Sequence, residues 1–244
     1  MVRASQVHTV LDSVRAARHV AGADVTATSP VALAGYSQGG GASAAAAELA
    51  DDYAPELDVK GAYAGAPPAD LVKVADALEG GPNAGFLLYA MGGQLAAYDV
   101  DPAAYLDAEG EDVLDRAEAS CTSDASQFAG LDSSAITSSG LSFPQLVRTD
   151  PVLSGIIAEQ RLGQMGHVPE MPVMIAHSLI DDVIPYSVGR GLGLRWCAQG
   201  ARVRFDPVFT PTHVGGYLAA QPRAQSFLDA VLQDRWTPDS CGWF

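Results

Sequence analysis

Short apolar runs that we interpret as buried strands occur near both ends of the chain, and no strand of clear period occurs in its middle. They cover residues 31–34, 59–64, 173–177 and 203–205. Stretches with a helical spacing of apolar residues precede, separate and follow these runs, at about residues 4–21, 40–50, 186–199 and 215–233. A strand, a helix and a strand in this order favour a right-handed parallel crossover. The pattern therefore predicts an α/β fold with a mostly parallel sheet of about four strands.

The middle of the chain, residues 69–168, has a different character. Helical stretches at 70–78 and 84–95 alternate there with acidic segments and with Ser- and Gly-rich segments, and no strand of clear period occurs. We interpret this part as a helical insertion, or cap, in an α/β core. The expected division is a first core part at 1–68, the cap at 69–168 and a second core part at 169–244.

Composition narrows the possible partners. Of the 244 residues 48% are hydrophobic, which is enough for a sizeable core, and the formal net charge is -15. Such a field repels nucleic acid and anionic membrane surfaces, so we expect no nucleic-acid partner. No apolar run approaches the roughly 18–20 residues that span a bilayer. The start of the chain has the pattern of an amphipathic helix, so we expect no signal peptide in this chain.

The three cysteines, Cys121, Cys197 and Cys241, are too few for a disulfide scaffold and lack the spacing of a zinc site. Buried free thiols are the ordinary interpretation. In an exported protein, Cys197 with Cys241 is the favoured pair, because both lie outside the expected cap. Cys121 would then remain without a partner in this chain.

The clearest chemical signal is Gly35-Tyr36-Ser37-Gln38-Gly39, which fits the pattern G-x-S-x-G directly after an apolar run. A nucleophilic serine on a sharp turn between strand and helix occupies strained backbone space, so we expect glycine two positions to either side of it. The helix that follows directs its positive end to the place where an oxyanion would form. We therefore interpret Ser37 as a nucleophile and the backbone N–H of Gln38 as an oxyanion donor.

A serine hydroxyl needs a base to accept its proton. In α/β folds with a G-x-S-x-G turn between strand and helix, the chain order is serine, acid, histidine, so the base comes last. His213 lies in a loop between the fourth apolar run and the last helical stretch, where this order requires the base. His8 and His19 precede the nucleophile, and His167 lies in a connecting segment. His177 ends an apolar run, where a hydrogen-bonded core histidine is the more ordinary role.

The acid is expected a few residues after the third apolar run, at the same edge of the sheet as the nucleophile. Asp181 occupies this place, with Asp182 directly beside it. Asp206, which follows the next strand, is an outside candidate. A pair of aspartates in a loop is usually turn chemistry, so chain order is what favours Asp181.

Three segments together resemble the secretory lipase family of the lipase-A type, namely GYSQGGG, DDVIPY and THVGGYLAAQPRAQSFL. The resemblance covers nearly the whole chain. It implies an α/β-hydrolase core, a helical cap, secretion, hydrolysis of lipid or other carboxylic esters, and no metal or organic cofactor. Residue by residue, it assigns the nucleophile to Ser37, the acid to Asp181, the base to His213 and an oxyanion donor to Gln38.

The chain departs from the family before the nucleophile. Family members carry a long segment there, with the first half of the sheet and a loop that gives a second oxyanion donor. Here 36 residues precede Ser37, and about four strands can be counted where the full fold has about eight. We therefore expect the strand at 31–34 to lack one neighbour and to promote a homo-oligomer through the exposed edge of the sheet.

The expected substrate is a lipid or other carboxylic ester. Tyr36 beside the nucleophile and Phe86, Leu87 and Met91 in the cap are candidates for the substrate pocket, although apolar residues at helical spacing are more often core. Cutinase-like esterases share the G-Y-S-Q-G string but have almost no cap, and their acid lies close to the histidine. An alternative from another class of function is a binding module, namely a hydrolase-like fragment with little or no catalysis.

Overall fold

The computed structural model describes residues 1–164 and 166–244, which form two compact units. The core unit comprises Arg3–Ala69 and Arg161–Phe244, and the helical unit comprises Met1–Val2 and Asp70–Gln160. Of the residues that we expect in the cap, 69, 161–164 and 166–168 group with the core unit. Each unit is described here by itself.

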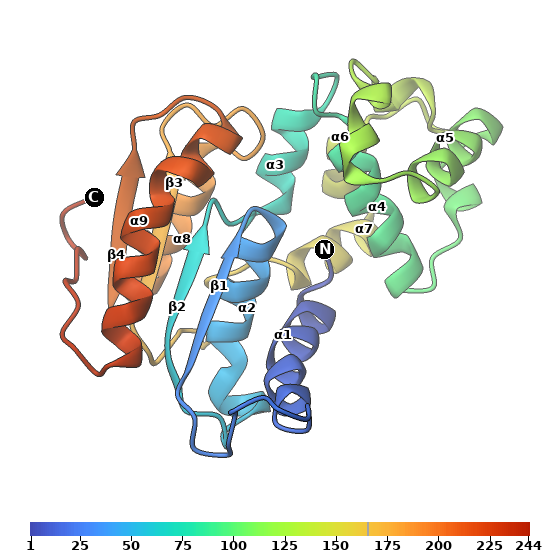
Figure 1. Ribbon diagram of the computed structural model, residues 1–244. Helices are drawn as coiled ribbons and strands as arrows, with labels where there is room; N and C mark the ends of the chain where they lie inside the picture. Colours follow the sequence, from blue (N-terminus) through green and yellow to red (C-terminus); the bar gives the residue numbers. More distant parts are fainter. Residues whose placement is uncertain (165) are drawn as a thin grey trace. The chain divides into compact units, whose positions relative to one another are not determined.

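The core unit contains a parallel sheet whose strands follow chain order (Figure 1). Strand β1 pairs with β2, β2 with β3 and β3 with β4, all in parallel. The prediction of an α/β fold with about four parallel strands is thus confirmed. Their bounds are Val31–Tyr36 for β1, Val59–Gly65 for β2, Val173–Ser178 for β3 and Val203–Val208 for β4.

Helix α9 (His213–Leu232) covers one face of this sheet. Because side chains alternate along a strand, every second residue turns to this helix. A buried cluster joins the two elements: Tyr63, Met174, Ala176 and Val208 from the strands, and Ala220, Ala224, Phe227 and Val231 from the helix.

Helices α1 (Arg3–Ala17), α2 (Gln38–Tyr53) and α8 (Tyr186–Ala198) complete the core unit. Buried Glu48 of α2 ties the three together, because its carboxylate accepts hydrogen bonds from Arg3 and from the Trp196 indole of α8. Burial raises the pKa of the Glu48 carboxyl. Helix α1 ends earlier than the sequence pattern predicts, at Ala17, because the residues that follow are mostly exposed and bury no apolar face.

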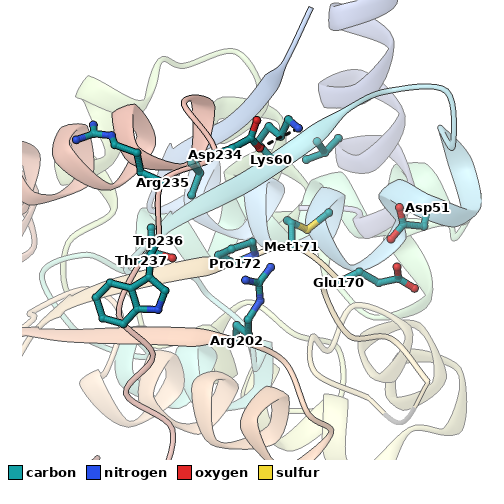
Figure 2. Close-up of a pocket in the computed structure, with 12 residues that line it drawn as sticks. Asp51, Lys60, Glu170, Met171, Pro172, Arg202, Asp234, Arg235, Trp236 and Thr237 are labelled. Carbon is teal, nitrogen blue, oxygen red and sulfur yellow. Dashed lines mark ion pairs between the residues drawn. The ribbon is translucent and has the colours of Figure 1, made fainter. Parts of the chain in front are cut away.

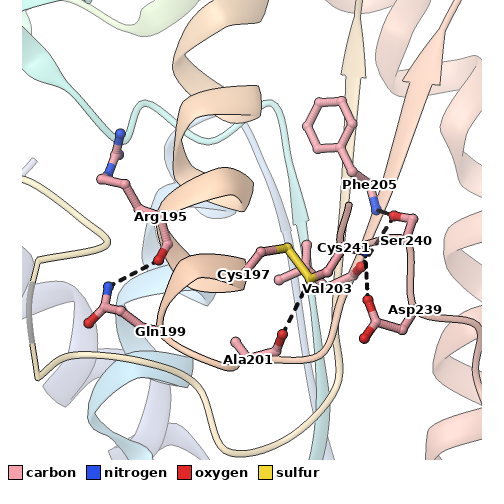
Figure 3. The surroundings of a disulfide bond; sticks show 9 residues. All are labelled: Arg195, Cys197, Gln199, Ala201, Val203, Phe205, Asp239, Ser240 and Cys241. Carbon is pink, nitrogen blue, oxygen red and sulfur yellow. Dashed lines mark hydrogen bonds between the residues drawn. A yellow bond between two sulfur atoms is a disulfide. The ribbon is translucent and has the colours of Figure 1, made fainter. Parts of the chain in front are cut away.

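The two edges of the sheet differ. Along β4 lies the C-terminal segment, where Ser240 donates its backbone N–H to the Val203 carbonyl and accepts from Phe205 N–H, at 2.9 and 2.7 Å (Figure 3). A disulfide between Cys197 and Cys241 fastens this segment to α8. Strand β1 is the other end of the sheet order and has no second strand neighbour within the described part of the chain.

The helical unit consists of short helices joined by turns, as its sequence pattern predicts. A single antiparallel bridge, Leu106 to Thr137, is its only β pairing within the described residues. Aspartates cap several of its helices at their N-termini, including Asp107 and Asp150. Its α-helices are α3 (Leu71–Leu78), α4 (Gly85–Ala97), α5 (Ala108–Glu118), α6 (Phe143–Thr149) and α7 (Pro151–Glu159), with 3₁₀ turns η1 (Pro102–Ala104), η2 (Thr122–Phe128) and η3 (Ser133–Ala135). Over the described residues, no helix has both the length and the apolar character needed to cross a membrane.

Candidate active site

Ser37 lies on the sharp turn between β1 and α2. Its backbone has φ 59° and ψ −124°, a region that a residue with a side chain rarely occupies. Such a conformation costs on the order of 1–3 kcal/mol and persists where the surroundings impose it. Here the Ser37 N–H donates to the Gly65 carbonyl at 2.9 Å, and the Ser37 carbonyl accepts from Gly41 N–H at 3.0 Å. The strand and the helix therefore hold the serine in place from both sides.

The glycines around this turn are crowded at positions that differ in part from our expectation. A Cβ atom on Gly35 would lie 2.0 Å from the Gly39 carbonyl oxygen, so glycine is required there. At Gly39 nothing lies within 4 Å of such an atom. The crowded residue on the helix side is Gly40, whose Cβ would lie 2.1 Å from the Gly65 carbonyl oxygen of β2. The second glycine required by packing is therefore three positions after the serine.

Asp181 and His213 are in direct contact. The Nδ1–H of His213 donates to both carboxylate oxygens of Asp181, at 3.0 and 2.8 Å. The Asp181 carboxylate is fully buried, and its Oδ1 also accepts from the backbone N–H groups of Val183 and Ile184. Burial opposes ionisation of this carboxyl, but the hydrogen bond from His213 and the two backbone donors outweigh it, so the pKa of Asp181 lies below its usual range.

His213 is the first residue of α9, and its backbone is fixed independently of its ring. Its N–H donates to the Asp182 carboxylate at 2.7 Å, and the preceding Thr212 caps the helix by accepting from Gly215 N–H. The two neighbouring aspartates thus hold different parts of His213, Asp181 its imidazole and Asp182 its backbone N–H. With Nδ1 engaged, the other ring nitrogen, Nε2, is buried and has no hydrogen-bond partner in the described part of the chain.

Tyr36 connects this histidine to the end of β1. Its hydroxyl donates to the His213 carbonyl at 2.8 Å, and the two rings are 5.0 Å apart between centroids. Burial, followed by the nearby Asp181 charge, raises the pKa of the Tyr36 phenol. His213 is therefore held against the residue that precedes Ser37, although no hydrogen bond joins its Nε2 to the serine. Catalytic hydrogen bonds are often long in unliganded enzymes.

Sequence reasoning missed these two contacts of His213, with Tyr36 and with Asp182. The sequence predicts only a substrate-binding role for Tyr36. The contact with Asp182 could have been found from the Asp181-Asp182 pair, because two neighbouring carboxylates in one loop can accept from both the ring and the backbone N–H of His213.

The other candidates lie in different surroundings. Asp206 is paired with Arg223 at 3.2 Å and with Arg204 at 3.5 Å. His8 stacks on Tyr53 in the core unit, 4.3 Å between ring centroids. Gln38 is the first residue of α2, so its backbone N–H is one of those without an acceptor inside the helix.

The apolar candidates of the expected cap lie on helix α4. Leu87 is buried there, whereas Phe86 and Met91 are half-buried. The Phe86 ring is 6.3 Å from that of Tyr89 in an edge-on arrangement. Their contact with a substrate stays a prediction.

A pocket of about 500 Å³ lies in the core unit between the N-terminal ends of strands β2, β3 and β4 and the segment that ends and follows α9 (Figure 2). Lys60 and Asp234 form an ion pair at its wall, 3.0 Å between nitrogen and oxygen. None of the candidate site residues lines it. It is therefore distinct from the place where Ser37, Asp181 and His213 follow their strands.

Comparisons with known proteins agree with the fold. A profile of the secretory lipase family matches residues 1–240. Lipase A of Moesziomyces aphidis is 30% identical over 230 residues, which cover 84% of this chain and 45% of that protein. A probable inactive lipase of Mycobacterium tuberculosis is 30% identical over 223 residues, which cover 90% of this chain and 49% of that protein.

The X-ray structure of Candida antarctica lipase A is similar with a TM-score of 0.86 at 24% identity, covering 98% of this chain and 57% of that chain. This similarity identifies the α/β-hydrolase fold. The chain spans about half the length of the curated relatives it matches. Because the family profile matches almost the whole sequence, the chain belongs to the secretory lipase family.

Proposed function

We propose that this protein hydrolyses carboxylic esters through Ser37, His213 and Asp181. The observation that carries the proposal is the pairing of the His213 Nδ1–H with a buried carboxylate, which leaves Nε2 free for a proton. This imidazole is held against the end of the strand that carries a serine in strained backbone geometry. A nucleophile, a base and an orienting acid are the groups that acyl transfer requires.

In the proposed mechanism, His213 Nε2 takes the hydroxyl proton of Ser37 while Oγ attacks the ester carbonyl carbon. Asp181 fixes the imidazole tautomer and stabilises the imidazolium. The carbon–oxygen bond to the alcohol then breaks, and the leaving oxygen receives the proton from His213. Water attacks the acyl-enzyme with the same base, which releases the acid and restores Ser37. The backbone N–H of Gln38 would stabilise the oxyanion in both steps.

Exposed apolar side chains on the loops and the helix that carry Asp181 and His213 support a neutral, apolar ester as the substrate. Ile180 and Phe209, which follow β3 and β4, are 68% and 81% exposed, and Val214 and Leu218 lie one helical turn apart on α9 and are 65% and 64% exposed. The base gives its proton to the leaving alcohol, so groups around it would contact that part of the substrate. Lipids or similar esters fit such a surface, and secretion of the protein accords with its family.

We propose that the helical unit is the cap of this enzyme and that Phe86, Leu87 and Met91 contribute to binding the acyl chain. Support comes from its all-helical character and from its insertion between two parts of the core unit. The chain-length dependence of the reaction tests this role. Replacing half-buried Met91 by Ser should reduce kcat/KM for long acyl chains more than for acetate.

We also propose that β1 pairs with β1 of a second copy. Within the described residues one edge of this strand has no partner, and its sequence, VALAGY, lacks charge and proline, features that leave an edge open to pairing. Sedimentation at micromolar concentration should show a dimer for the wild type and a monomer for Ala34→Lys, because exposed Ala34 lies on this strand. A monomeric wild type would contradict the proposal.

The first test of ester hydrolysis uses p-nitrophenyl esters of short and long acyl chains, with Ser37→Ala as the control. Activity that Ser37→Ala abolishes would support the proposal, and the chain-length profile would distinguish an esterase from a lipase. Labelling of Ser37 by a fluorophosphonate probe is the second readout. Equal inertness of both proteins, with no labelling, would favour a binding module without catalysis, the interpretation to which the inactive relative points.

A further inference from the structure

The histidine at the end of β3, His177, is completely buried and lies next to the acid of the proposed triad. Its Nε2 is 2.8 Å from the Ile184 carbonyl oxygen and 3.5 Å from Oδ2 of Asp181. Its other nitrogen, Nδ1, has no hydrogen-bond partner in the described part of the chain. The backbone of α8 approaches that nitrogen so closely that a Cβ on Gly189 would lie 2.2 Å from it.

These contacts determine the protonation state of the ring. A carbonyl oxygen can only accept, so Nε2 carries the proton and donates it to Ile184. Burial lowers the pKa of His177, which keeps the ring neutral. Nδ1 is then a bare acceptor enclosed by protein. An apolar side chain would avoid this unfavourable burial, so stability of the core does not explain why a histidine stands here.

The loop between β3 and α8 shows what the Nε2 proton does. Ile184 donates its N–H to Oδ1 of Asp181 and accepts at its carbonyl from His177. One residue is thus held on both sides, by the acid and by the buried imidazole. With Oδ1 also occupied by the Val183 N–H, the carboxylate cannot rotate without breaking backbone hydrogen bonds. The same carboxylate faces the His213 ring.

We propose that His177 is a positioning residue that acts through Ile184 to hold Asp181 against His213. This inference rests on the proposed function of the triad. It extends that function, because the orientation of the acid then depends on a second, neutral histidine that touches neither the substrate nor the nucleophile. A shift of about 1 Å in a catalytic group can reduce turnover by about 100-fold, so a modest movement of this loop would be measurable.

Three substitutions separate positioning from packing. His177→Gln carries an amide donor close to the place of Nε2, His177→Asn carries a donor that is too short to reach Ile184, and His177→Phe keeps the ring volume without a donor. Ile175→Val is the matched control, because Ile175 is also fully buried, lies two residues earlier on β3 and faces the same side of the sheet.

We expect kcat for a p-nitrophenyl ester to fall about 10- to 100-fold in the Asn and Phe variants at unchanged KM, with most of the activity restored in the Gln variant. Ile175→Val should retain wild-type kcat. The proton of His213 Nδ1, observed downfield in the NMR spectrum, should shift or broaden in the Asn and Phe variants and remain in the Gln variant. Full activity and an unchanged Nδ1–H signal in folded Asn or Phe variants would overturn the proposal. So would a loss in Ile175→Val as large as theirs.

The two readouts also separate this inference from the proposed function. If the wild type hydrolyses no ester, the proposed function fails, but the Nδ1–H signal still reports whether His177 holds the Asp181–His213 pair. If the wild type is active and the signal is the same in all variants, the proposed function stands and the role of His177 is refuted.

Discussion

A methyl group added at Gly40 should destabilise the protein, whereas the same group added at its neighbour Gly39 should stabilise it. The Cβ of alanine at position 40 would lie 2.1 Å from the Gly65 carbonyl oxygen, where ordinary contact begins at 3.4 Å. The obstacle is backbone of the central strand β2 and cannot rotate away, so α2 or β2 must move to relieve the contact. Overpacking in a core costs about 1–3 kcal/mol, and we expect the upper end here.

At Gly39 the new methyl group meets nothing within 4 Å, and the residue lies in the first turn of α2. Alanine there removes backbone freedom from the unfolded chain, which is worth about 0.5–1 kcal/mol. Urea unfolding of the wild type, Gly39→Ala and Gly40→Ala should therefore place the two variants on opposite sides of the wild type, about 3–4 kcal/mol apart. Fluorophosphonate labelling of Ser37 should be slowed in Gly40→Ala, because its turn is held by Gly65. Equal stabilities, or a larger loss at Gly39, would refute the packing argument.

Three further outcomes are expected. Asp181→Asn should reduce kcat by about 10⁴-fold, because the amide would hold the wrong tautomer of His213. Asp206→Asn should keep a kcat within a few-fold of the wild type. The reverse order in an ester assay would assign the role of the acid to Asp206. The pKa of Asp181 is lower in the folded protein than in the unfolded chain. The ionised carboxylate therefore stabilises the fold above the unfolded pKa of about 3.9, and this contribution is lost as the pH falls through the folded pKa. The unfolding free energy of Asp181→Asn should accordingly depend less on pH below about 4 than that of the wild type. Cys197→Ser removes a disulfide that spans 44 residues and should lower the unfolding free energy by about 4 kcal/mol. Cys121→Ser is the control and should not change it, because the Cys121 thiol is free and exposed. Equal melting temperatures of the two variants would contradict this prediction.

The sequence predicted the strands correctly and indicated the candidate site residues where a local residue pattern agreed with the order of the elements along the chain. Apolar runs predicted the strands because a parallel sheet that is covered on both faces needs apolar residues throughout. Chain order assigned Asp181 and His213, and the structure brings these two side chains into contact. The elbow pattern correctly indicated a strained serine, since its backbone geometry is a local property of the turn.

The remaining features depend on contacts between distant segments, which no local pattern encodes. The hydroxyl of Tyr36 reaches a carbonyl 177 residues away in the sequence. The crowding at Gly40 arises from β2, so the motif alone suggested Gly39 instead. The unsatisfied nitrogen of His177 likewise becomes visible only when α8 packs against β3.

The C-terminal segment that lies along the β4 edge has a consequence for how the protein is produced. The disulfide between Cys241 of this segment and Cys197 of α8 forms only under oxidising conditions. In a reducing compartment the tail is retained by the Ser240 hydrogen bonds and by the stacking of Phe244 on Phe205, at 4.6 Å between ring centroids. When it detaches, neither outer strand has a neighbour on its free side within the described residues. If β1 pairs as proposed, one molecule can then join two neighbours. On the proposed pairing of β1, expression in a reducing cytoplasm should therefore yield chains that polymerise, whereas oxidative folding should yield dimers.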